Sequence, residues 1–331
     1  MKASDIHDAV VEAEQRIRPH VVATPLRHSF YLSRLTGANV LCKLENVQLT
    51  GSFKARGAAN KILQLTGSER KRGVVTASSG NHGTAVAAIM ARLGGSCVVF
   101  VPETTPRVKL EAMKAFGAEV RQQGTDSGLC EAAAIEFAKT SGLTYVSPYD
   151  DPAVIAGQGT IGAEISRAAP DVAMTVIAVG GGGLTSGVAG YLKAVNPQVR
   201  IIGASPENDH SMLLSARAGH AVVHEDAKDT LSDGTAGSVQ PGAITIPLCA
   251  ALVDDWPAAG EVEIAKAVCD FLAYENMVIE GAAGVAVAAF LRIAAKEPQA
   301  VNGKTVAILI CGGRIDPDKL IKILKRKNGP Q

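Results

Sequence analysis

The chain has 331 residues, of which 47% are hydrophobic, 20% are charged and 34 are glycine, a composition typical of globular rather than disordered or fibrous proteins. Its formal net charge is +1 and only 4% of its residues are aromatic, so neither nucleic acid nor a membrane surface is an expected partner. The six cysteines form no Cys-x-x-Cys pair, which gives no zinc or redox motif and suits a reducing compartment. No signal-peptide core and no apolar stretch of ~18 residues is present. We therefore expect a cytoplasmic protein.

Segments typical of strands and helices alternate along most of the chain. From the N-terminus we expect a strand over 40–45, a helix over 54–65, a strand over 73–78, a helix over 82–94, a strand over 96–102, a helix over 105–117, then segment 118–124, a helix at about 126–141 and segment 143–148. The chain continues with a helix over 156–168, a strand over 174–183, a helix to about 195, a strand over 199–207, helices over 261–275 and 282–296, and a strand over 305–313.

This alternation predicts the class of fold. Continuous apolar strands separated by helices are typical of parallel sheets covered by helices on both faces, which makes this an α/β protein. Ligands of such sheets bind at the carboxyl ends of the strands. The run from residue 73 to about 150 is self-contained, and we expect it to form a smaller, inserted lobe.

The first candidate site residue is Lys54, which follows a Gly-Ser turn at the start of the helix expected over 54–65. Proximity to a helix N-terminus and partial burial both lower the pKa of a lysine. A lysine with a lowered pKa can act as a Schiff-base nucleophile and as a base. The alternative is a solvated loop lysine, which this segment taken alone favours.

A second candidate site follows the strand expected over 73–78. Its small polar residues and free backbone N–H groups at a helix start can cradle an anion, either a carboxylate or a phosphate. These residues are Ser78, Ser79, Gly80, Asn81 and His82. The alternative is an ordinary N-cap formed by Ser78 or Ser79, and His82 is favoured as a helix-start residue with no catalytic role.

Two more loops follow predicted strands. Four consecutive glycines allow a phosphate to approach the backbone at a helix N-terminus, and they are Gly180, Gly181, Gly182 and Gly183. The same loop matches a dinucleotide-binding fingerprint only loosely, with Glu207 as the downstream acidic residue. Cys311 directly follows the last strand, where a small side chain can face a ligand. The alternative for Cys311 is a buried core thiol.

Taken together and in this order, these segments resemble the fold-type II enzymes that depend on pyridoxal 5′-phosphate (PLP). Among them the chain is similar to the serine/threonine dehydratases, with serine racemase close by. The resemblance covers nearly the whole chain and rests on residues 24–58, 147–165, 279–289 and 308–316. It implies a tryptophan synthase β-like fold with PLP in the cleft between two lobes. The large PLP-binding domain would comprise residues 1–67 and 151–331, and the small inserted domain residues 73–150.

The resemblance also implies how PLP would be held. Lys54 would form the Schiff base beside Phe53, and Asn81 would hydrogen-bond the 3′-oxygen. Cys311 would face the pyridine nitrogen, and Glu280 would lie near the cofactor. The phosphate would be bound by Gly180, Gly181, Gly182, Gly183 and Leu184.

The substrate would bind beside the cofactor. Its side chain would lie near Asp233 and Gly234. Its carboxylate would be bound by Ser78, Ser79, Gly80, Asn81 and His82.

The implied reaction is α,β-elimination from a β-hydroxy amino acid, L-threonine or L-serine, to a 2-oxo acid and ammonia. Lys54 would remove the Cα proton. A neutral Cys311 thiol would leave the pyridine nitrogen largely unprotonated and weaken the electron sink, which suits elimination better than transamination.

Other functions stay open. One is a dehydratase for 3-hydroxyaspartate, phenylserine or a hydroxyectoine-derived compound. Another is a serine racemase in which Ser79 is the second acid/base. A third is a non-catalytic PLP-binding protein. A nucleotide-binding oxidoreductase would leave Lys54 unexplained.

Some features differ from the family pattern. Relatives that bind a divalent cation use acidic residues where this chain has Ser205 and Ser211, so we expect no metal, with Glu207 and Asp209 as the alternative ligands. Arg314 stands where Asn is common, and we interpret it as solvated, with contact to an acidic substrate as the alternative. The chain stops soon after the last motif, so no C-terminal regulatory domain is expected. A homodimer is the family expectation.

Overall fold

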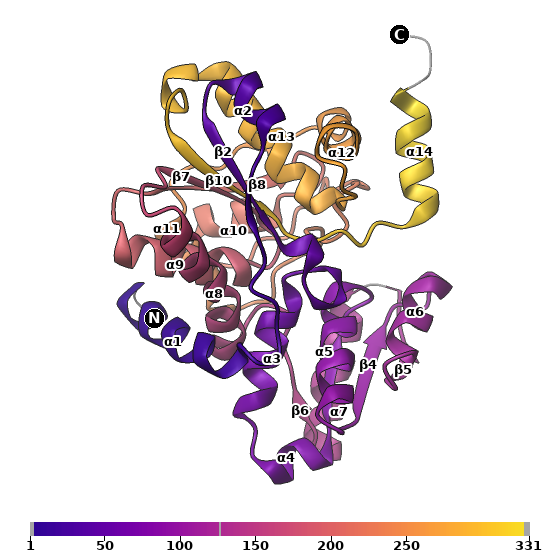
Figure 1. Ribbon diagram of the computed structural model, residues 1–331. Helices are drawn as coiled ribbons and strands as arrows, with labels where there is room; N and C mark the ends of the chain where they lie inside the picture. Colours follow the sequence, from indigo (N-terminus) through magenta and orange to yellow (C-terminus); the bar gives the residue numbers. More distant parts are fainter. Residues whose placement is uncertain (1–2, 126, 328–331) are drawn as a thin grey trace.

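The computed structural model describes residues 3–125 and 127–327 (Figure 1). Its larger sheet has six strands in the order β1-β2-β10-β7-β8-β9. They are β1 (Leu26–His28), β2 (Asn39–Leu44), β7 (Met174–Ala178), β8 (Arg200–Pro206), β9 (Ala258–Ala259) and β10 (Thr305–Ile310). Neighbours from β2 to β9 pair in parallel, whereas β1 pairs antiparallel to β2. The prediction of an α/β fold with parallel sheets is confirmed. The strand β1, which was not predicted, adds an antiparallel edge, because one short helix between β1 and β2 returns the chain for that pairing.

The smaller sheet has four parallel strands in the order β5-β4-β3-β6. They are β3 (Val74–Ala77), β4 (Cys97–Val101), β5 (Glu119–Gln122) and β6 (Thr144–Tyr145). The division into domains at 1–67, 73–150 and 151–331 stays a prediction. Residues 1, 2, 126 and 328–331 of those ranges lie outside the described part of the chain, as does the first residue of the helix expected from 126.

Helices cover both faces of the larger sheet, as Figure 1 shows. Helices α8 and α9 pack against each other and against α1, and α13 packs on β7, β8 and β10. The helices are α1 (Ala3–Ile17), α2 (Phe30–Thr36), α8 (Pro152–Ala168), α9 (Gly183–Val195), α10 (Ser211–Ala218), α11 (Thr245–Leu252), α12 (Glu261–Glu275), α13 (Gly281–Lys296) and α14 (Pro317–Lys327).

Helix α8 begins four residues before the predicted start at residue 156. The reason is a cap: the Asp151 carboxylate accepts hydrogen bonds from the backbone N–H groups of Ala153 and Val154. Pro152 then occupies the first turn, where its missing N–H costs nothing.

Helices α5 (Asn81–Arg92), α6 (Arg107–Lys114) and α7 (Ser127–Ser141) pack on the smaller sheet. Helices α3 (Lys54–Gln64) and α4 (Gly67–Arg72) come before it in the chain. Helix α3 packs on both α5 and α8 and so joins the two halves of the molecule. Short 3₁₀ helices cover Glu45–Val47, Leu49–Gly51 and Pro298–Ala300.

This arrangement brings several chain segments to one place. Strands β3, β7 and β10 end at Ala77, Ala178 and Ile310, and α3, α5 and α9 begin nearby around one cavity. Parallel sheets place their ligands at this end of the strands. In the described part of the chain no helix is long and apolar enough to cross a bilayer.

Candidate active site

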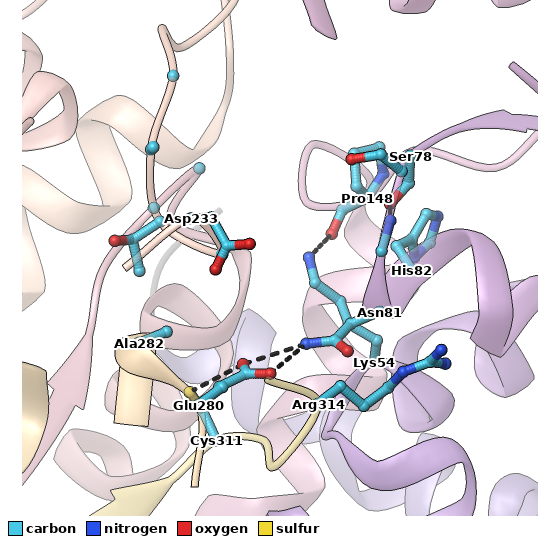
Figure 2. A pocket seen from close by; sticks show the side chains of 18 of the residues that line it. Lys54, Ser78, Asn81, His82, Pro148, Asp233, Glu280, Ala282, Cys311 and Arg314 are labelled. Atoms are coloured by element: carbon cyan, nitrogen blue, oxygen red, sulfur yellow. Dashed lines mark hydrogen bonds between the residues drawn. The ribbon is translucent and has the colours of Figure 1, made fainter. Parts of the chain in front are cut away.

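A cavity of about 520 Å³ lies at the carboxyl ends of these strands (Figure 2), within the size range of small-molecule sites. Most of the residues predicted from the sequence line it. They are Phe53, Lys54, Ser78, Ser79, Gly80, Asn81, His82, Gly180, Gly181, Gly182, Gly183, Leu184, Asp233, Gly234, Glu280 and Cys311. Six stretches of chain far apart in the sequence therefore share one cavity.

Lys54 is the first residue of α3 and points into this cavity. Its Nζ donates a hydrogen bond to the carbonyl oxygen of Pro148 at 2.7 Å and lies 5.1 Å from the ring centre of Phe53. Burial disfavours the charged amine and lowers the pKa of Lys54 to about 8. The alternative of a solvated loop lysine is therefore wrong.

The turn before Lys54 is tightly constrained. Thr50 has a φ of 65°, which a β-branched residue rarely adopts. Gly51 follows with a φ of 75°, which glycine adopts without strain. This pair of left-handed residues turns the chain sharply and sends it into α3 with Lys54 at the first position.

The loop from Ser78 to His82 joins β3 to α5. Its N-cap is Gly80, which offers no side-chain cap, so the interpretation of Ser78 or Ser79 as the N-cap is wrong. The Ser78 hydroxyl instead accepts from the Gly80 N–H at 3.3 Å within the loop. The N–H groups of the first helical turn are left without a side-chain cap, and such groups can receive an anion.

His82 lies in the first turn of α5 and is 1% exposed. Its Nε2–H donates to the Val146 carbonyl oxygen at 3.1 Å. Burial, together with the nearby charge of Lys54, lowers the pKa of His82 to about 3. The imidazole is therefore neutral, which agrees with a structural rather than an acid/base role.

The glycine loop joins β7 to α9. Gly182 is the N-cap, with a φ of 84° and no side-chain cap. A Cβ added at Gly181 would lie 2.4 Å from Cγ of Tyr149, and one at Gly183 would lie 2.7 Å from the Tyr149 carbonyl oxygen. Only glycine fits these positions, and the uncapped N–H groups of α9 can hold a phosphate.

Glu280 lies at the base of the cavity and binds two of the predicted residues. Asn81 Nδ2 donates to both carboxylate oxygens at 3.1 and 2.9 Å, and the Cys311 thiol donates to Oε1 at 3.8 Å (Figure 2). Burial raises the pKa of Glu280 to about 7. Burial, with the neighbouring Glu280 carboxylate, raises the pKa of Cys311 well above its usual range. The Cys311 thiol is therefore neutral.

Charged side chains lie toward the mouth of the cavity. The Asp233 carboxylate pairs with Lys109 Nζ at 3.2 Å and Lys319 Nζ at 3.7 Å. Arg314 is partly buried and lines the cavity, so its interpretation as a solvated residue is wrong. The reason is tertiary: its side chain lies against the turn at Gly51.

Several cavity residues had no predicted role. Pro148 accepts the Lys54 hydrogen bond, and the Tyr149 side chain packs under the glycine loop, with its hydroxyl accepting from the Gln240 N–H at 3.1 Å. Both residues lie in segment 147–165, and the resemblance of that segment to the family could have pointed to them. No sequence signal pointed to Lys109, because the pattern of exposed residues around it is common to many surface helices.

The alternative metal ligands lie elsewhere. Glu207 pairs with Arg292 at 2.8 Å. Asp209 accepts hydrogen bonds from the Ser211 hydroxyl at 2.8 Å and the Gly237 N–H at 2.7 Å. Within residues 3–125 and 127–327 no three His, Cys, Asp or Glu side chains are grouped so as to hold a metal ion.

The cavity residues fit PLP. The uncapped α9 N-terminus is suited to a phosphate, because a backbone anion site needs free N–H groups and no Cβ. A buried lysine with a lowered pKa is suited to Schiff-base formation with the aldehyde. The neutral Cys311 thiol is suited to an unprotonated pyridine nitrogen. The phosphate, the aldehyde and the pyridine nitrogen of PLP therefore each have a matching group in the cavity.

Comparison with known proteins agrees with this assignment. The family model for pyridoxal-phosphate-dependent enzymes matches residues 17–312. The L-threonine ammonia-lyase of Thermotoga maritima is 42% identical over 317 residues, which cover 96% of this chain and 77% of that protein. The processed threonine deaminase isoform 2 of Solanum lycopersicum superposes with a TM-score of 0.91 at 33% identity, covering 98% of this chain and 94% of that one. Maize serine racemase superposes with a TM-score of 0.89 at 29% identity, covering 97% of each chain. This chain belongs to the pyridoxal-phosphate-dependent enzyme family and has the fold-type II architecture.

Proposed function

We propose that the chain is a PLP-dependent ammonia-lyase that converts a β-hydroxy amino acid, L-threonine or L-serine, to a 2-oxo acid and ammonia. The observation that carries the proposal is Lys54, a buried amine with a pKa of about 8 in the cavity that also holds the α9 N-terminus. Relatives named as threonine ammonia-lyase and threonine deaminase, similar over nearly the whole chain, support it.

The substrate would be oriented by its carboxylate. The uncapped first turn of α5 and the small residues Ser78 and Ser79 provide N–H and hydroxyl donors on one wall of the cavity. Asp233 lies across the cavity from Ser78 (Figure 2). The substrate side chain would lie near Asp233 and Gly234. In this orientation the Cα–H bond would point toward Lys54.

Lys54 would act as the base. An amine with a pKa of about 8 is neutral more often at physiological pH than an ordinary lysine, so it can accept the Cα proton. When bound, PLP supplies an electron sink for the negative charge that develops at Cα. The β-hydroxyl would take up a proton, which Lys54 can return after accepting it from Cα, and would leave as water. The released enamine would then hydrolyse to the 2-oxo acid and ammonia.

The proposal is tested with Lys54→Ala and the wild-type protein, both prepared with PLP. The wild type should show the visible absorption band of a PLP Schiff base, which borohydride should abolish, and should release 2-oxo acid from threonine or serine. Lys54→Ala should show neither. A wild type with no band would contradict the central assignment.

A substrate panel decides between the dehydratases that stay open. Threonine, serine, 3-hydroxyaspartate, phenylserine and a hydroxyectoine-derived compound are compared by kcat/KM for 2-oxo acid release. The largest value identifies the substrate. An absorption band without turnover of any of them would indicate a non-catalytic PLP-binding protein.

Serine racemisation is the second candidate. Ser79 lines the same cavity as Lys54 and is not the N-cap of α5, so its hydroxyl is available as a second acid/base. The similarity to maize serine racemase supports this. Formation of D-serine from L-serine faster than pyruvate would favour it, and Ser79→Ala should then abolish D-serine formation while elimination continues.

We also propose a cytoplasmic homodimer. All six cysteines are buried and none of them forms a disulfide, which suits a reducing compartment. Phe30 is 81% exposed and Tyr274 is 56% exposed, and large exposed apolar side chains often mark protein interfaces. Light scattering should give twice the chain mass for the wild type and a lower mass for a Phe30→Ser/Tyr274→Ser variant; a monomeric wild type would contradict the dimer.

A further inference from the structure

Arg314 lines the cavity in a fixed position between β10 and α14. Its backbone N–H lies beside the Glu280 carboxylate, which also accepts from Asn81. Its methylene groups lie against the preceding turn, where a Cβ added at Gly51 would be 3.2 Å from Arg314 Cγ. Figure 2 shows the guanidinium on the same side of the cavity as Asn81 and His82, across from Asp233.

Glu280 attracts the charge of Arg314, but no acidic side chain contacts its guanidinium in the described part of the chain. In residues 3–125 and 127–327 its guanidinium has no hydrogen-bond or ion-pair partner, and burial lowers its pKa. The Lys109 amine, by contrast, is paired with Asp233 at 3.2 Å. Glu280 is occupied by Asn81, and Asp316 accepts from the Asp318 N–H at 2.8 Å as the start of α14.

An unpaired and partly buried guanidinium favours an anion. Removing a cation from water is costly unless an opposite charge replaces the lost hydration, and the planar fork of arginine matches the two oxygens of a carboxylate. The cofactor phosphate would lie at the Gly180–Gly183 loop. The backbone N–H of Arg314 and the side chain of Asn81 instead share the Glu280 carboxylate. The guanidinium lies on the side of the cavity that holds Asn81 and His82, in the loop predicted to bind the substrate carboxylate (Figure 2).

We propose that Arg314 binds a carboxylate of the substrate. This carboxylate is either the α-carboxylate, shared with the Ser78–His82 loop, or a second carboxylate carried by the substrate side chain. The inference rests on the proposed function, because it assigns the substrate group that this cavity recognises.

The kinetic test compares Arg314→Gln and Arg314→Lys with the wild type, using threonine and 3-hydroxyaspartate. Loss of a charged hydrogen bond should lower kcat/KM by about ten- to hundredfold, mainly through KM, in Arg314→Gln. Arg314→Lys should recover part of the loss. Loss for both substrates identifies the α-carboxylate, and loss for 3-hydroxyaspartate alone identifies a side-chain carboxylate. A change of less than about threefold for both would overturn the proposal.

A binding test separates this inference from the proposed reaction. Succinate and butyrate have the same number of carbons but differ by one carboxylate, and their affinities for the PLP-loaded protein are measured by calorimetry. Arg314→Gln should weaken both ligands if the α-carboxylate is bound, or succinate alone if a second carboxylate is bound. If the wild type turned over none of the amino acids, the proposed function would fail, but these affinities would still report on Arg314.

Lys109→Gln is the matched control, because it removes a cavity cation that Asp233 already neutralises. We expect this variant to change the affinities for succinate and butyrate by less than about threefold. An equal loss in Lys109→Gln and Arg314→Gln would show that general electrostatics, not contact with Arg314, governs carboxylate binding, and would overturn the proposal.

Discussion

Lys54 and Glu280 line the same cavity, and burial shifts both of their pKa values toward the neutral form. The pKa of Lys54 falls to about 8 and that of Glu280 rises to about 7. Burial penalises charge of either sign, so it lowers the pKa of a base and raises that of an acid. The site therefore pairs a reactive amine with a carboxyl group that can be neutral near physiological pH.

Glu280 should make the stability of the PLP-free protein depend on pH. Its folded pKa of about 7 lies above the usual value of 4.5. A raised folded pKa stabilises the fold below the unfolded pKa, and this contribution is lost as pH rises through the folded pKa. The free energy of unfolding of the wild type, relative to that of Glu280→Gln, should fall by on the order of 3 kcal/mol between about pH 4.5 and 7.

The measurement is urea unfolding of both PLP-free proteins at a series of pH values. A glutamine side chain does not titrate. Subtracting the free energy of unfolding of Glu280→Gln from that of the wild type at each pH therefore removes the contributions of all other ionisable groups. A difference that stays constant across this pH range would show that Glu280 keeps an ordinary pKa.

At the scale of elements, the site depends on helix N-termini that lack side-chain caps. Helix α5 begins after Gly80 and α9 after Gly182. Most helices satisfy these N–H groups with a Ser, Thr, Asp or Asn cap, as α8 does with Asp151. Without a side-chain cap these two helices are somewhat less stable, but their first N–H groups remain able to donate hydrogen bonds to anionic ligands.

The α9 loop should not tolerate a larger residue than glycine. Gly181→Ala would place a Cβ 2.4 Å from Tyr149 Cγ, so the ring or the loop must move. We expect PLP affinity to fall by at least about tenfold, equivalent to about 1.4 kcal/mol, measured by fluorescence titration of the PLP-free protein.

Gly67→Ala is the control for this change, because a Cβ at Gly67 meets nothing within 4 Å. It should bind PLP as the wild type does. Unchanged PLP affinity in Gly181→Ala would mean that this loop does not hold the phosphate.

At the scale of the whole molecule, one buried ionic network joins the two halves. Arg56 is 0% exposed and pairs with Glu45 at 2.8 Å and Glu164 at 2.9 Å. Glu164 also accepts from the buried Lys43 at 2.5 Å, and these cations lower the pKa of Glu164 to about 2. The network connects α3, α8 and the end of β2, and it fixes α3 two residues after Lys54.

Arg56→Met should therefore destabilise the protein strongly. The substitution leaves Glu45 without its arginine and leaves Glu164 with only Lys43 and the partly exposed Arg18 as cations, and breaking a buried ion pair typically costs about 3–5 kcal/mol. Chemical unfolding measures the loss. Arg107→Met removes an exposed pair with Glu111, in which the arginine is 89% exposed, and should leave the free energy of unfolding almost unchanged. Similar losses in the two variants would contradict the role of the network.

Much of the fold could be predicted because its signals are local. Apolar runs such as residues 174–178 predict buried strands, and the helix periodicity after them predicts the covering layers. The short edge strand Leu26–His28 could not be predicted, because three residues carry no period and its antiparallel pairing depends on β2. Local patterns supplied Lys54 and three loops of the site, and the resemblance to a family added residues such as Glu280 and Asp233. The cavity contains all of these candidates except Glu207 and Asp209.

The sequence by itself determined the order of strands and helices and the glycine loops between them, because periodicity and backbone freedom depend on neighbouring residues. Only the tertiary structure decided which distant groups meet. Asn81 and Glu280 are 199 residues apart and form hydrogen bonds across the cavity. Lys54 owes its low pKa to protein atoms that the fold places around it, and Arg314 owes its position to the turn at Gly51. Burial and charge pairing are properties of the assembled cavity, so no local pattern encodes them.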